Sequence, residues 1–61
     1  MSAANIEKVA EVAETLDNLL GALQLPMPPA FHVEQMKSHL PDLREKLRAV
    51  YVAETGENPW A

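Results

Sequence analysis

The chain has no cysteine, only two glycines and no long apolar run among its 61 residues. The lack of cysteine excludes disulfides and thiolate metal sites. With only Gly21 and Gly56 available, there is no glycine-rich loop that could cradle a phosphate. No stretch approaches the roughly 18 apolar residues of a membrane span, and the N-terminus lacks the pattern of a signal peptide. We therefore expect a soluble, cytoplasmic protein that does not act at a membrane.

Basic residues are also few: the chain has five Lys and Arg against nine Asp and Glu, which gives a net charge of −4. This balance argues against direct binding to nucleic acid or to anionic membranes, since both need clustered basic side chains. The charges are unevenly placed: residues 1–25 carry net −3 and residues 30–50 carry net +1. The asymmetry favours side-by-side helices, and the overall charge suits a partner with a basic surface.

Two apolar stripes repeat with alternating steps of three and four residues, which is typical of amphipathic helices. They predict an all-α helical hairpin in which one stripe packs on the other as a hairpin seam. The seam residues are Val9, Val12, Leu16, Leu19 and Leu23 in the first stripe, and Val33, Met36, Leu40, Leu43, Leu47 and Val50 in the second.

Prolines mark the expected boundaries within a single domain, residues 1–61. The first helix should cover about 3–24, followed by a Pro-rich connector at 26–29. Pro41 removes a backbone donor in the middle of the second stripe, so we expect that segment to be kinked or divided into helices at about 30–39 and 41–55. The tail, residues 56–61, should be irregular. The prediction is thus a hairpin of two to three helices.

A hairpin of this size buries little surface, so its apolar positions call for more partner surface than one chain provides. Further apolar residues flank the seam and form a candidate interface: Ile6, Leu20, Phe31, Tyr51, Val52 and Trp60. Self-association into a bundle or docking on a partner would cover them. Trp60 either folds back toward Tyr51 or anchors a partner.

An acidic stripe on the first helix consists of Glu7, Glu11 and Glu14. It is either a solvated face or a contact for a basic partner. Paired catalytic carboxylates would need a cleft, and the chain is too small to offer an obvious one. No Gly-x-Ser-x-Gly turn surrounds any of its few hydroxyls.

The two histidines, His32 and His39, are seven residues apart, or roughly 10.5 Å along a helix. That spacing is too long for one shared metal ion, and no third ligand completes a site. We therefore expect no enzymatic activity, no metal and no cofactor.

The sequence favours a small, acidic, non-enzymatic protein–protein interaction module: an adaptor, an assembly factor or an inhibitor that acts by covering a partner's surface. Its expected partners are a second copy, in a homodimer, and a larger protein with a basic or apolar surface. Two alternatives remain open. One is a structural subunit of a larger assembly such as a virion or a multi-subunit complex, and the other is an acidic inhibitor of a nucleic-acid-binding protein.

Overall fold

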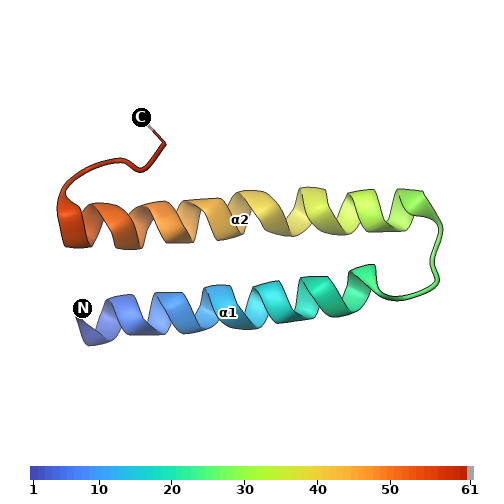
Figure 1. The fold of residues 1–61 in the computed structure, drawn as a ribbon, viewed down its shortest axis with the longest axis horizontal. Coiled ribbons are helices and arrows are strands. Elements are labelled where there is room, and N and C mark those ends of the chain that lie inside the picture. Colours follow the sequence, from blue (N-terminus) through green and yellow to red (C-terminus); the bar gives the residue numbers. More distant parts are fainter. Residues whose placement is uncertain (61) are drawn as a thin grey trace.

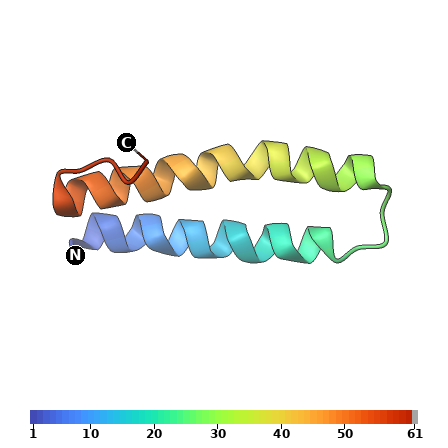
Figure 2. The same cartoon turned by 45° about the horizontal axis from the view of Figure 1, so that its top comes forward.

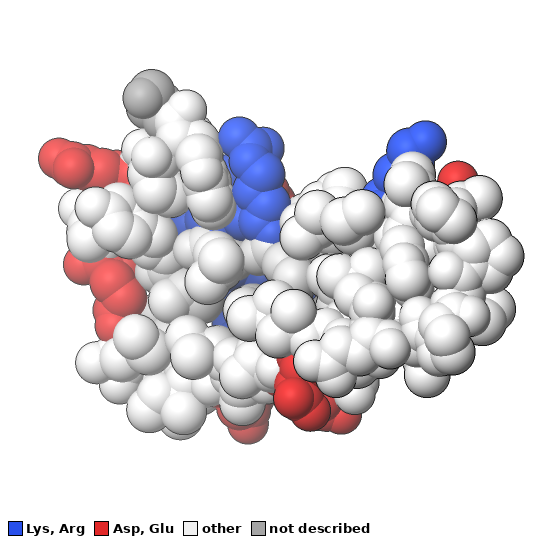
Figure 3. Space-filling model, turned by 45° about the vertical axis from the view of Figure 1, so that its right-hand side comes forward, with Lys and Arg blue, Asp and Glu red and all other residues white. Residues whose placement is uncertain are grey.

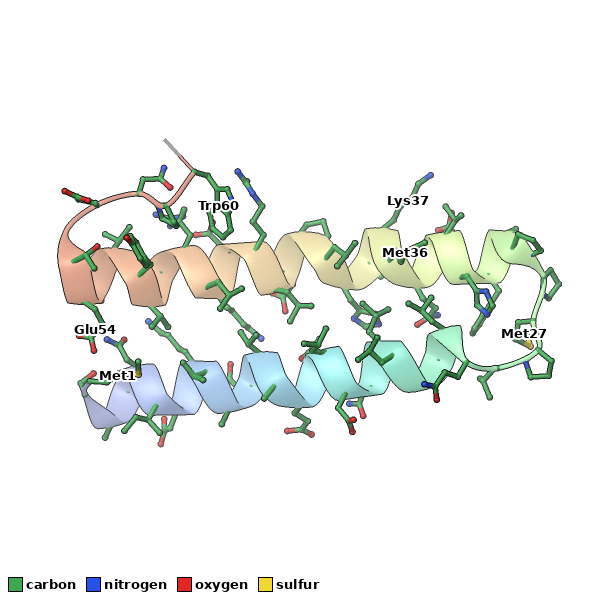
Figure 4. The ribbon with its side chains drawn as sticks, in the orientation of Figure 1. Met1, Met27, Met36, Lys37, Glu54 and Trp60 are labelled. Carbon is green, nitrogen blue, oxygen red and sulfur yellow. The ribbon has the colours of Figure 1, made fainter. Side chains whose placement is uncertain are left out.

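The computed structural model describes residues 1–60 as two antiparallel helices, α1 (Ala3–Leu23) and α2 (Pro29–Thr55), joined by a short connection (Figure 1). Over this range the chain contains no strand. The end of α2 lies beside the start of α1, where the terminal amine of Met1 is 3.4 Å from Oε1 of Glu54 (Figure 4). The predicted all-α hairpin is therefore confirmed.

The first helix begins at a serine cap. Ser2 has extended backbone angles, and its Oγ accepts a hydrogen bond of 3.2 Å from the backbone N–H of Asn5. This bond satisfies one of the backbone donors that a helix start leaves free. Asn5 itself is buried. At the other end α1 passes through Gly21 without interruption and stops at Leu23.

The two helices are linked by residues 24–28, and Pro29 belongs to α2 as its first residue. A proline suits this position because its missing N–H would have no partner in the first turn. One side-chain contact ties the link to the helix: Nε2 of His32 lies 3.0 Å from the carbonyl oxygen of Leu25 in a hydrogen bond. Met27 lies at the turn (Figure 4).

Pro41 lies inside α2, which continues through it to Thr55 as one helix. The expected division into separate helices at 30–39 and 41–55 is not observed. Pro41 removes the helical donor of the Lys37 carbonyl, and both residues are exposed, so the lost hydrogen bond lies on the solvent side of the helix. The apolar stripe also keeps its phase across Pro41, so packing on α1 favours a continuous helix over the local preference for a break.

The second helix ends at Gly56, which has φ 76° and whose N–H donates 2.8 Å to the carbonyl oxygen of Val52. This left-handed conformation is readily accessible to glycine. The tail then folds back along α2 (Figures 1 and 2).

The contact between the helices is thin. Only Leu19, Leu43 and Val50 are buried apolar residues among those described, and the Cα positions span 41 × 25 × 11 Å. The hairpin is therefore a slab one helix thick, with two broad sides and almost no enclosed core.

Candidate protein-binding surface

The predicted seam residues are distributed over three levels of exposure. Leu19, Leu43 and Val50 are buried between the helices, whereas Val12, Leu23 and Met36 are half-buried. The other five are exposed: Val9, Leu16, Val33, Leu40 and Leu47. Leu19 is 3% exposed and Leu16, three residues earlier, is 44% exposed, so adjacent positions of one stripe point in different directions.

The exposed apolar residues form one stripe on each helix. On α1 they follow the buried and half-buried contact positions by one or four residues, as Leu16 follows Val12 and Leu20 follows Leu19. On α2 the displacement is the same, as Leu47 follows Leu43 and Tyr51 follows Val50. Each stripe is therefore rotated in the same sense from the helix–helix contact.

Because α1 and α2 are antiparallel, equal rotations in the same sense bring both stripes to the same broad side of the slab. We call this surface the apolar face. It consists of Ile6, Val9, Leu16 and Leu20 on α1, and Val33, Leu40, Leu47 and Tyr51 on α2. Figure 3 shows a broad uncharged surface over both helices, with most of the charged side chains toward its margins.

The apolar face is large for a molecule of this size. Its eight side chains are between 39% and 56% exposed. At about 190 Å² for a fully exposed large residue they present roughly 700 Å². The whole hairpin exposes 4430 Å², whereas a folded monomer of this mass would expose about 3,900 Å². The excess surface is of the kind that marks an interaction site.

The opposite side of the slab is polar. Lys46 bridges the helices there, with Nζ 3.4 Å from Oε2 of Glu11 on α1 and 3.1 Å from Oδ2 of Asp42 on α2. These partners, Asp42 first, raise the pKa of Lys46. Because Glu11 precedes the contact residue Val12, the acidic stripe is rotated away from the apolar face. The remaining two acidic-stripe residues, Glu7 and Glu14, are exposed on α1.

The other predicted interface residues have separate positions. Phe31 and Val52 are half-buried outside the two exposed stripes, and the ring of Phe31 meets that of His32 edge-on at 5.9 Å. Trp60 folds back on α2, where its ring lies 4.8 Å from Cζ of Arg44 (Figure 4). A turn in which the Trp60 N–H donates 3.0 Å to Oδ1 of Asn58 supports this position.

Basic side chains follow the outer edge of α2 next to the apolar face. Lys37 and Arg44 come one residue after Met36 and Leu43, the same displacement that places Tyr51 on the face. This edge was not singled out from the sequence, although the seven-residue spacing of Lys37 and Arg44 is visible there. Within residues 1–60 neither side chain forms an ion pair.

A second ion pair lies on the solvent side of α2. Nε of Arg48 donates a 2.9 Å hydrogen bond to Oε2 of Glu45, and a further nitrogen pairs with Oε1. The pairing lowers the pKa of Glu45 and raises the pKa of Arg48. It stabilises α2 locally and does not join the helices.

The part of the chain that the structure covers contains no pocket and no group of three side chains suited to hold a metal ion. His32 and His39 are both half-buried. Neither helix as described is long and apolar enough to span a bilayer. The apolar face is therefore the most extensive candidate site.

Comparison with family models, with curated proteins and with solved structures found no match to this chain.

Proposed function

We propose that this chain is a non-enzymatic protein–protein interaction module that acts by covering a partner's surface with its apolar face. One observation carries the proposal: among residues 1–60, eight large apolar side chains are exposed on one side of the slab, whereas only three apolar side chains are buried. Water contact with roughly 700 Å² of apolar surface is unfavourable, so a protein surface that replaces the water gains free energy.

The polar side of the slab supports a role in which only one broad side binds. Lys46 forms ion pairs with Glu11 on α1 and Asp42 on α2, so the side of the slab opposite the apolar face carries paired charges. Exposed Glu7 and Glu14 keep that side hydrated. An adaptor, an assembly factor and an inhibitor can all work in this way, because each needs one apolar surface that binds the partner and one polar surface that stays in water.

The slab shape supports a second candidate, a structural subunit of a larger assembly. A layer with a Cα extent of 11 Å in its thinnest direction can be covered on its apolar side by neighbouring subunits. An acidic inhibitor of a nucleic-acid-binding protein has less support, because Glu11 is already paired with Lys46.

The test is photo-crosslinking in the cells from which the sequence comes. A photoreactive phenylalanine analogue replaces Leu40 on the apolar face or, as the matched control, Ser38 on the other side of the same helix. Both positions are exposed and two residues apart. We expect covalent protein adducts from position 40 and few from position 38.

Circular dichroism of each purified variant checks that the helices remain. Absence of adducts from position 40, or equal labelling from both positions in folded variants, would refute the proposal. The number of different proteins in the adducts separates a dedicated module from a subunit with several neighbours.

A further inference from the structure

We infer that the apolar face binds a second copy of this chain, with α1 of each copy lying over α2 of its partner. This inference rests on the proposed function and names the partner. The apolar face and the charges along its two outer edges carry it.

The area is sufficient for a stable dimer. Two apolar faces of roughly 700 Å² bury about 1,400 Å² together, which is within the 1,200–2,000 Å² of a standard protein interface. Two slabs stacked on these faces make a four-helix bundle with one shared core. In that core the exposed seam residues, such as Leu16 and Leu40, become buried.

Charge decides how the copies are oriented. The outer edge of α2 carries Lys37 and Arg44. The outer edge of α1 carries Asp17, which precedes Leu20 of the apolar face by three residues. Among the described residues none of these three charges has an ion-pair partner within the chain. Arg44 already contacts the ring of Trp60 in its own chain, so Asp17 and Lys37 are the charges that a dimer can pair across the interface.

Two symmetric stackings are available. If the two-fold axis runs parallel to the helices, α1 lies over the partner's α2, and Asp17 approaches a basic edge. If the axis crosses the helices, α2 lies over the partner's α2, and the row of Lys37 and Arg44 meets its own copy. Like charges in direct opposition are unfavourable, so the first stacking is preferred.

The position of each residue along the helix axes predicts which residues meet across the dimer interface. Within one hairpin Met1 lies beside Glu54 and Glu11 beside Lys46. By the same antiparallel register Asp17 is level with residues 38–40. An axis parallel to the helices preserves these levels, so Asp17 lies near Lys37 of the partner subunit.

The experiment first measures molar mass by light scattering over a dilution series, and then maps the contact by chemical crosslinking. Because the chain has no natural cysteine, Asp17→Cys, Lys37→Cys and Arg44→Cys each introduce a single thiol at an exposed position. The Asp17→Cys and Lys37→Cys chains are unfolded together, refolded as a mixture and treated with a short bis-maleimide. Each variant is also treated alone.

We expect a dimeric mass, a crosslinked product from the mixture and none from any variant alone. A crosslinked product from Arg44→Cys alone would indicate that α2 lies over the partner's α2, and it would overturn the inference. A dimer with no crosslink in any sample would also overturn the proposed arrangement. A monomeric mass at all concentrations would overturn the inference that a second copy binds the apolar face. In that case, photo-crosslinking to a different protein would still support the proposed function.

A charge exchange gives an independent readout. Asp17→Lys and Lys37→Asp should each weaken the dimer by roughly 2- to 30-fold, because the contact occurs twice in each dimer. The double variant should recover most of the affinity. Additive losses in the double variant would contradict a direct contact between these two positions.

Discussion

Pro41 lies in the interior of a continuous helix, so its replacement by alanine should stabilise the protein. A proline in a helix interior is less favourable than alanine by about 3 kcal/mol, since it removes one hydrogen bond and crowds the preceding turn. Pro41 is exposed, so the substitution restores a donor toward the Lys37 carbonyl without opening a cavity. Because Lys37 and Pro41 are both exposed, water competes for that carbonyl in the wild type, and we expect a gain of about 2–3 kcal/mol.

The assay is urea and thermal unfolding of the wild type and Pro41→Ala at equal concentration, followed by helical circular dichroism. In a domain of this size 1 kcal/mol corresponds to about 4–8 °C in Tm, so the variant should melt roughly 10–20 °C higher. Equal concentrations are needed because any self-association makes Tm depend on concentration.

The matched control is Pro29→Ala in the same helix. Pro29 is the first residue of α2, where proline costs no hydrogen bond and its fixed φ favours the helix. Its replacement should leave the stability unchanged or lower it by up to about 1 kcal/mol. If Pro41→Ala gave no more stability than Pro29→Ala, residue 41 would not lie in a regular helix interior, and the continuous α2 would be wrong.

Three further predictions concern the two glycines and the ion pairs of α2. Gly56→Ala should destabilise the hairpin by about 1–2 kcal/mol in urea unfolding, because residue 56 has φ 76°. Gly21→Ala should stabilise it by about 0.5–1 kcal/mol, since the added methyl meets no atom within 4 Å, and a loss would indicate a close neighbour there in the assembled state. Unfolding midpoints should fall slightly in acid, because the ion pair with Arg48 is lost as pH drops through the lowered pKa of Glu45, and also in alkali, as pH rises through the raised pKa of Lys46. Glu45→Gln should reduce the loss of stability in acid. An acid dependence that this variant leaves unchanged would contradict a contribution from the pair.

Helix type and direction followed from local rules that the sequence contains. A stripe with a period of 3.6 residues can bury one side only as a helix, so two such stripes separated by prolines predict an antiparallel pair. In the structure the Ser2 hydroxyl caps α1, and α2 ends at Gly56 because glycine, which has no Cβ, readily adopts the left-handed conformation there. These features depend on neighbours within a few residues.

Tertiary structure decided the continuity of α2. Proline disfavours a helix locally, and the sequence offers no measure of how strongly packing on α1 opposes that preference. Of the kink or division expected at Pro41, the division is absent because the stripe continues in phase on both sides, so one continuous helix keeps both Leu43 and Val50 buried.

The rotation of each helix about its own axis was also beyond the sequence. Leu16 and Leu19 belong to one apolar stripe and differ little in chemistry, so periodicity alone assigns both to the same contact. In the folded hairpin α1 turns so that Leu19 is buried, Leu16 is exposed and Asn5 lies in the contact. That angle is set by how the side chains of the two helices interlock, which is a property of the assembled pair, and Lys46 pairs with Glu11 in the resulting arrangement. The sequence by itself determined that a wide apolar stripe exists on each helix, and only the packing of one helix against the other decided which part of it remains available for a partner.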